Sequence, residues 1–296
     1  MKKYNSTYLI AFTLLSLLLG CNRSSKKEVK QLEVGNIEII DGAAIDAPDY
    51  WNNAELVWSD EFDGNDLSEA DWKFETGQHG WGNNEWQNYV AHENIEVSDG
   101  TLKIIANKVG AGQKVGDYTS ARLNSKASFT YGRIEIRAKL PEHRGNGLWP
   151  ALWMLGNNIS TIGWPACGEI DLMEYVSYDP NIVHFTIHSA ANNHVEGTQL
   201  SSGPVTLNSI EEEFHNYGVL WTEKYLKFYL DEIDNIIFAF QRPAEPNASN
   251  WPFSKPFYVL MNIAVGGNWG GLQGVDDSIF PAIMEVDYVR VFQVNK

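Results

Sequence analysis

The sequence contains very few cysteines and few positive charges. Only two of its 296 residues are cysteines, Cys21 and Cys167, which excludes the disulfide framework that stabilises many small secreted domains. Lysine and arginine total 22 against 38 acidic residues, for a formal net charge of −16, so nucleic acids and anionic membrane surfaces are excluded as partners. Stability must come from a hydrophobic core, for which 11 Trp, 13 Tyr and 13 Phe supply material.

The apolar run near the start of the chain is too short for a stable membrane-spanning helix. Two lysines at positions 2 and 3 precede the apolar residues 8–19, an arrangement typical of a secretory signal. The run ends in LLGC at 18–21, which resembles the lipobox of bacterial lipoproteins. We therefore expect a signal peptide at 1–20, a lipidated Cys21 with a flexible tether at 21–50, and one folded domain at 51–296. The protein would be exported and membrane-anchored by lipid alone, at the outer membrane or cell surface; an uncleaved signal anchor is the alternative.

Helical periodicity is scarce, whereas short β-type runs recur from Trp51 onward between Gly, Asn, Asp and Pro residues. In RIEIRAKL at 133–140, Ile134 and Ile136 alternate with charged residues, which predicts a strand with one buried face. Helical pieces are predicted only at 68–72 and 211–214. The pattern predicts an all-β sandwich of two packed antiparallel sheets, and a domain of about 245 residues suits a large jelly roll.

Three acids lie close together in GEIDLMEY at 168–175. Side chains alternate along a strand, so Glu169 and Asp171 share a face, while Glu174 would point away from it in a regular strand. A β-bulge at Leu172–Met173 would return Glu174 to that face. Crowded carboxylates raise the pKa of at least one member, as acid/base chemistry requires. A solvated strand edge and a site for a hard cation are the alternatives.

Eight motifs occur in a specific order between Trp58 and Phe292. They are WSDEFDG (58–64), GWGNNEWQNY (80–89), YGRIEIRAKLP (131–141), GLWPALWMLG (147–156), GEIDLMEY (168–175), FHNYGVLWT (214–222), MNIAVGGNW (261–269) and VDYVRVFQ (286–293). In these motifs the chain resembles glycoside hydrolase family 16, and most of all its bacterial endo-β-1,3-glucanases, the laminarinases. The resemblance implies a concanavalin-like jelly roll with a concave substrate cleft, and it makes 51–296 the catalytic domain.

The same resemblance assigns roles to individual residues. It makes Glu169 the nucleophile, Glu174 the general acid/base and Asp171 an assisting carboxylate in a retaining double displacement that needs no cofactor. The spacing of Trp149 and Trp153 leaves open whether one of them is a core residue. The positions that match sugar contacts or a supporting role are Asn84, Arg122, Trp149, Trp153, His188, Asn262 and Trp269.

The resemblance also implies a structural calcium site away from the cleft. Its oxygen ligands would be Glu61, the carbonyl of Gly100 and Asp287. A domain held by ordinary hydrogen bonds, without calcium, is the alternative. Cys167, directly before the acidic motif, is expected to be a small buried hydrophobic residue rather than a nucleophile.

Several functions remain open at this level. The resemblance favours hydrolysis of β-1,3-glucan such as laminarin, by a monomer. A mixed-linkage glucanase, a galactanase acting on agar, porphyran or carrageenan, and a transglycosylase would share the catalytic pair. A non-catalytic glucan-binding protein belongs to a different class. Binding relatives tend to lose the catalytic glutamates, so the complete set of three acids favours an enzyme.

Overall fold

The computed structural model describes residues 51, 53–142 and 144–294, all within the compact unit Val34–Lys296. The predicted signal peptide, the lipidation site Cys21 and the tether lie outside the described residues. Within the described part, no helix is both long and apolar enough to cross a membrane.

The larger of two sheets has ten strands. Their order is β16 (Ile236–Gln241), β15 (Tyr225–Leu230), β14 (His215–Trp221), β8 (Gly132–Lys139), β18 (Ala282–Val294), β5 (Thr101–Lys108), β6 (Tyr118–Ser120) and β3 (Gln87–Tyr89), with β1 (Ala54–Asp60) paired to β18 and β4 (Ile95–Ser98) paired to β5. The pairs are antiparallel except β3 with β6, which is parallel.

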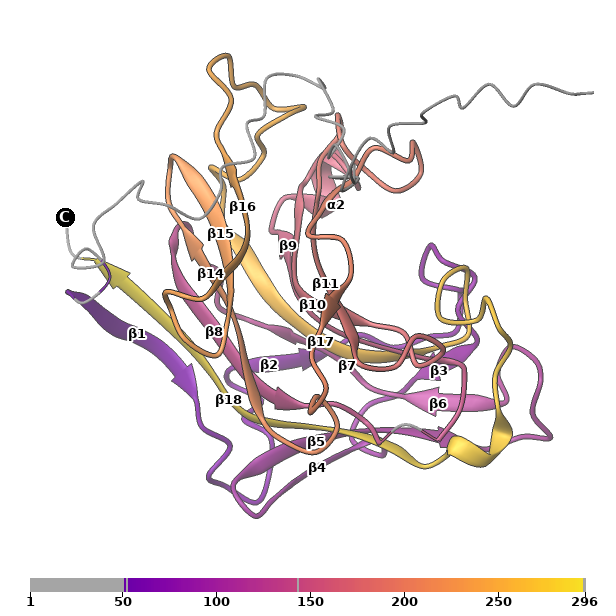
Figure 1. Ribbon diagram of the computed structural model, residues 1–296. Coiled ribbons are helices and arrows are strands. Elements are labelled where there is room, and N and C mark those ends of the chain that lie inside the picture. Colours follow the sequence, from indigo (N-terminus) through magenta and orange to yellow (C-terminus); the bar gives the residue numbers. More distant parts are fainter. Residues whose placement is uncertain (1–50, 52, 143, 295–296) are drawn as a thin grey trace, which may run out of the picture. The chain divides into compact units, whose positions relative to one another are not determined.

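The second sheet has eight strands and carries the candidate site. Their order is β12 (Leu200–Ser201), β11 (Ile182–His188), β10 (Glu169–Tyr175), β9 (Leu148–Gly156), β17 (Phe257–Val265), β7 (Arg122–Ser125) and β2 (Trp72–Phe74), with β13 (Val205–Thr206) paired to β11. Figure 1 shows the sheets as two curved layers, with β9, β10, β11 and β17 side by side in one of them.

The core lies between the two sheets, as the alternation predicts. Ile134 and Ile136 of β8 are fully buried and belong to one cluster with Ile170 and Leu172 of β10. Burying an Ile or Leu side chain contributes about 1.5–3 kcal/mol, so facing rows of this kind hold the layers together. The prediction of an all-β sandwich of two sheets is confirmed, with the one parallel pair as a departure from purely antiparallel pairing.

Both predicted helical pieces are wrong. Residues 69–71 and 208–212 are turns, and Ser68 donates its hydroxyl to the Asp71 carboxylate without starting a helix. Between residues 53 and 294, leaving aside residue 143, the helical segments are short: α2 (Ile159–Ile162) and the 3-10 turn η1 (Asp277–Ile279). A single turn cannot offset the nucleation cost of a helix by itself, so tertiary contacts decide where such turns form.

Candidate active site

A bulge in β10 places the three acids on one face of the eight-stranded sheet. The pairing of β10 with β11 shifts register between Asp171 and Glu174, and its pairing with β9 shifts between Asp171 and Met173. Leu172 and Met173 are both fully buried in the core. Two consecutive residues therefore point inward, and Glu174 returns to the outer face with the other two acids, as the spacing predicts.

The strand begins at a position that only glycine fits. Gly168 has φ +84°, and a Cβ added there would lie 2.7 Å from Cγ of Pro252 and 2.8 Å from Cζ of Phe257. Any larger residue would combine backbone strain with a steric clash. Gly168 therefore sets the direction in which Glu169 enters the strand.

The acids lie in a cavity of about 260 Å³. Its lining includes Glu169, Asp171 and Glu174 from β10, the outer face of β9, and residues of β7, β17 and three loops. Trp149 and Trp153 both line it, since residues four apart in a regular strand share a face. Neither tryptophan is a core residue, which settles that alternative.

Two indole N–H groups point at the two glutamates. Nε1 of Trp164 donates to Oε2 of Glu169 at 3.2 Å, and Nε1 of Trp149 donates to Oε1 of Glu174 at 3.2 Å. Each hydrogen bond favours the ionised form of its carboxyl group. Trp164 comes from the loop after α2 and was missed at the sequence level, because its distance to Glu169 depends on how that loop folds back.

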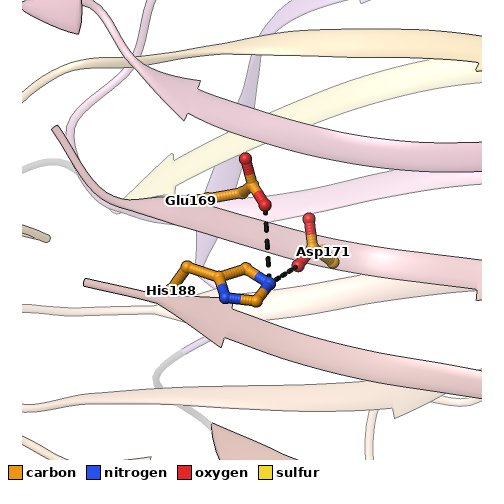
Figure 2. A group of neighbouring side chains, drawn as sticks. All are labelled: Glu169, Asp171 and His188. Atoms are coloured by element: carbon orange, nitrogen blue, oxygen red, sulfur yellow. Dashed lines mark ion pairs between the residues drawn. The ribbon is translucent and has the colours of Figure 1, made fainter. Parts of the chain in front are cut away.

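His188 lies beside two of the acids (Figure 2). Its Nε2 is 3.5 Å from Oε1 of Glu169 and 3.5 Å from Oδ2 of Asp171, and the three ligand atoms lie within 4.8 Å of one another. Burial and, to a smaller extent, the charge of His194 together lower the pKa of His188 to about 3, so the ring is neutral at neutral pH. This close group contains His188 and not Glu174, so it differs from the three-carboxylate cation site considered above.

Burial raises the pKa of all three acids. The pKa of Glu169 rises to about 8, with the charge of Glu174 adding to burial, while Arg122 and Trp164 oppose the rise. The pKa of Glu174 rises to about 7, and that of Asp171 is raised well above its ordinary value by burial and by both glutamates. Three carboxylates this close cannot all be ionised, so the group retains protons at neutral pH. A proton donor is therefore present where a glycosidase needs one.

A flat wall of the cavity is built around Arg122. The central carbon of its guanidinium lies 4.7 Å from the ring centroid of Trp81 and 4.7 Å from that of Trp153, and the guanidinium is paired with Glu75. Trp153 donates from Nε1 to Oδ1 of Asn262 at 2.8 Å. The predicted residues Arg122, Trp153 and Asn262 thus form one connected surface in the cavity.

Three predicted substrate-binding residues lie outside the cavity lining: His188, described above, and the two possible sugar contacts Asn84 and Trp269. Asn84 is exposed and donates from Nδ2 to Oδ1 of Asn268 at 2.9 Å. Trp269 is half-buried and packs edge-on against Trp149 at 5.3 Å and against His184 at 5.2 Å between ring centroids, so it lies next to the cavity wall. A sugar contact by either residue stays a prediction.

The predicted calcium ligands do not fit a cation as they are arranged. Both carboxylate oxygens of Glu61 accept from Arg290, at 3.0 and 2.7 Å, and Asp287 pairs with Arg137. These guanidinium groups supply the positive charge that a calcium ion would bring, and the Arg290 pair lowers the pKa of Glu61. The sequence could not show this, because both partners come from strands distant in the chain.

Cys167 is fully buried, and burial raises the pKa of its thiol to about 12. A thiol that stays protonated is a poor nucleophile. Its interpretation as a small buried hydrophobic residue agrees with this position.

Comparison with known proteins identifies the family. The model of glycosyl hydrolases family 16 matches residues 82–290, which is more than half of the chain. The chain belongs to glycoside hydrolase family 16. It is similar to a beta-glucanase of Rhodothermus marinus, at 42% identity over 95% of this chain and 93% of that protein.

Other family members support the same assignment. A glucan endo-1,3-beta-glucosidase of Cryptopygus antarcticus is 36% identical over 81% of this chain and 92% of its own length. The crystal structure of a laminarinase from Flavobacterium sp. UMI-01 superposes with a TM-score of 0.73 at 41% identity, covering 81% of this chain and all of that one. The resemblance seen in the sequence motifs is confirmed, and so is the jelly-roll fold.

Proposed function

We propose that this glycoside hydrolase cleaves β-1,3-glucan within the chain, with retention of configuration. The observation that carries the proposal is the bulged strand β10, which presents three proton-holding carboxyl groups on the floor of a cavity walled by tryptophan. The names of the relatives, among them beta-glucanase, glucan endo-1,3-beta-glucosidase and laminarinase, support the substrate class.

In the first step, an oxygen of Glu169 forms a bond to the anomeric carbon as the glycosidic bond breaks. Glu174 transfers its proton to the departing oxygen, so the leaving sugar departs as a neutral alcohol. Burial and the charge of Glu174 raise the pKa of Glu169 to about 8, so the first step proceeds from the form of the coupled group in which Glu174 holds the proton and Glu169 is ionised. The indole N–H of Trp164 and the charge of Arg122 favour this form. A protonated Asp171 adds no like charge beside the nucleophile.

In the second step, Glu174 is ionised and removes a proton from water. The water oxygen attacks the anomeric carbon from the face that the leaving sugar vacated, and the bond to Glu169 breaks. Two inversions give net retention. The hydrogen bond from Trp149 stabilises ionised Glu174 between the two steps.

The flat rings of Trp149 and Trp153 and the guanidinium of Arg122 provide the surface on which sugars lie. Aromatic rings bury apolar sugar faces, while the ring edges and Asn262 supply hydrogen-bonding groups. A neutral glucan suits this surface. Among the described residues that line the cavity, Arg122 is the one lysine or arginine, and it is already paired with Glu75, which makes a sulfated galactan the weaker candidate.

Reducing-sugar release tests the function on laminarin, mixed-linkage β-glucan, agarose, porphyran and carrageenan. We expect activity on laminarin, loss of about 10²–10⁴-fold in Glu174→Gln and at least as much in Glu169→Gln. Glu245→Gln, an exposed acid in the 242–255 loop, is the matched control and should keep wild-type activity. No hydrolysis of any of the five polymers, with retained binding to one of them, would favour the non-catalytic alternative. Activity on a galactan alone would show that the substrate is a galactan and not a β-1,3-glucan.

Azide rescue separates the two catalytic roles. With a laminaribiosyl fluoride donor, Glu169→Ala plus azide should give the glycosyl azide of inverted configuration, because azide replaces the nucleophile in a single displacement. Glu174→Ala plus azide should give the retained product, since azide then attacks the glycosyl-enzyme. The opposite pattern would exchange the roles of the two residues.

We also propose that the protein is an exported lipoprotein, anchored through Cys21 and acting as a monomer. The lysine pair, the apolar run and the LLGC ending support this location. Metabolic labelling with a radioactive fatty acid should mark the wild-type protein and not Cys21→Ser. Equal labelling of both, or labelling of neither, would contradict the proposal.

A further inference from the structure

Glu85 is a buried acid that the catalytic steps do not use. It precedes β3, its residue is only 4% exposed, and it lines the same cavity as the three acids. Arg122, the cation whose charge acts on its carboxylate, forms its ion pair with Glu75 instead. A buried carboxylate without a paired cation depends on hydrogen bonds for its stability.

Three side chains donate to this carboxylate. Nδ2 of Asn83 reaches Oε1 at 3.3 Å, Nε2 of Gln87 reaches Oε2 at 2.6 Å, and the hydroxyl of Tyr89 reaches Oε2 at 3.4 Å. Burial raises the pKa of Glu85, while these three hydrogen bonds and the charge of Arg122 oppose the rise and favour the ionised form. In that form the carboxylate can only accept, so it fixes the direction of each of these bonds. The Tyr89 hydroxyl has a single proton, which it gives to Glu85, and its oxygen is left as an acceptor.

The chain of hydrogen bonds continues from Tyr89 to the cavity wall. Nδ2 of Asn262 donates to the Tyr89 hydroxyl oxygen at 3.0 Å, and Oδ1 of Asn262 accepts from Nε1 of Trp153 at 2.8 Å. An amide has one oxygen and one NH₂ group, so fixing its NH₂ toward Tyr89 fixes its oxygen toward Trp153. The indole of Trp153 lies over Arg122 on one side and pairs in register with Asp171.

We propose that Glu85 is a positioning residue for the sugar-binding platform: through Tyr89 and Asn262 its carboxylate orients the indole of Trp153 beside Asp171. The part of the proposal that concerns sugar binding rests on the proposed glucanase function. The orientation of the Trp153 indole rests only on the direction of the hydrogen bonds. If the side-chain amide of Asn262 were turned around, its NH₂ group would face the N–H group of the Trp153 indole. Two donors cannot form a hydrogen bond, so the indole N–H would lose its acceptor.

A simpler role for Glu85 would be to anchor its own loop. That loop is already held to β17 by other groups: Trp86 N donates to Val265 O at 2.8 Å, and Val265 N donates to Oε1 of Gln87 at 2.8 Å. The first bond does not involve Glu85, whereas the second is made by the amide whose Nε2 donates to Glu85, so Glu85 also orients this anchor. A role confined to the anchor would lower stability and leave the indole of Trp153 in place, which separates it from the proposal.

NMR of the full chain tests the orientation without any substrate. The indole ¹H–¹⁵N signal of Trp153 is identified by its disappearance in Trp153→Phe, and its position is then compared in Glu85→Gln and Tyr89→Phe. We expect it to shift in both variants. Tyr217→Phe is the matched control, because it removes a buried tyrosine hydroxyl from β14 in the other sheet, and it should leave the signal in place.

Kinetics on laminarin test the consequence for sugar binding. Tyr89→Phe and Glu85→Gln should raise KM about 3–10-fold and change kcat less than about twofold. The Trp153→Phe variant keeps an aromatic ring but has no N–H. In this variant the same changes should raise KM by less than about a further twofold, because the indole N–H at the end of the hydrogen-bond chain is missing.

Three results would overturn the proposal: an unmoved Trp153 signal in both variants, a KM effect of the same size in the Trp153→Phe background, or a fall in melting temperature with KM unchanged. A wild-type protein that does not hydrolyse laminarin would refute the proposed function instead. The NMR comparison would still decide whether Glu85 orients Trp153.

Discussion

Replacing Glu174 by glutamine should stabilise the folded domain at alkaline pH and leave its stability near pH 4 almost unchanged. Burial raises the pKa of Glu174 from 4.5 to about 7, whereas the unfolded chain releases this proton near 4.5. Between these values the folded state binds more protons than the unfolded state, so the stability of the wild type falls as pH rises. The amide is neutral at every pH, keeps the shape of the side chain and can still accept from Trp149.

The size of the effect follows from the shift in pKa. A pKa that moves from 4.5 to about 7 corresponds to about 3 kcal/mol of unfolding free energy once the pH lies above both values. The stabilising contribution of the protonated group is fully present below pH 4.5 and is lost as pH rises through about 7. Glutamine also removes the charge that raises the pKa of Glu169, which adds to the gain at high pH.

Urea unfolding followed by tryptophan fluorescence at pH 4, 6 and 8 measures this effect. The difference in unfolding free energy between Glu174→Gln and wild type should grow from near zero to about 3 kcal/mol across the series. Glu245→Gln, an exposed acid, should show no such growth. A difference that stays constant with pH, or a variant less stable than wild type at pH 8, would refute the burial argument.

Further predictions concern the same site and the sheet that carries it. The kcat/KM on laminarin should fall above about pH 7, as Glu174 loses the proton it donates; a flat profile to pH 9 would exclude it as the acid. Gly168→Ala should lower the melting temperature and the activity, and should reduce the free energy of unfolding by about 1–3 kcal/mol or more. Gly163→Ala should have a smaller effect. Gly163 also has a positive φ, but no atom lies within 4 Å of a Cβ added there. Equal effects of the two would show that backbone strain, not the clash with Pro252 and Phe257, governs the site. Arg122→Lys should raise KM several-fold with kcat nearly unchanged, because a lysine lacks the planar guanidinium that contacts both indole rings. An unchanged KM would exclude Arg122 from the sugar-binding surface. Calcium added after chelation should leave the melting temperature within about one degree, since arginines already hold Glu61 and Asp287; a clear rise would show that calcium displaces Arg290.

The sequence by itself determined the features that depend on local periodicity. Alternation in the 133–140 run is enough to predict which face of β8 is buried, because a strand has a period of two whatever surrounds it. Period two by itself puts Glu174 on the opposite face from Glu169 and Asp171, so the bulge is predicted only once the three acids are taken to act together, as the family resemblance implies. The motifs identify the family, since their residues and their order along the chain are specific over nearly the whole domain.

Only the tertiary structure decided the contacts between segments distant in the chain. Arg290 pairs with Glu61 across 229 residues, and Tyr89 contacts Asn262 across 173 residues. Trp164 is close to Glu169 in the chain, but its contact depends on how the intervening loop folds. Burial of Glu85 depends on the same long-range packing. Periodicity predicts which way a side chain points but not which residues it contacts. The partners that determine charge, protonation and side-chain orientation in the cavity come together only when the two sheets and their loops fold.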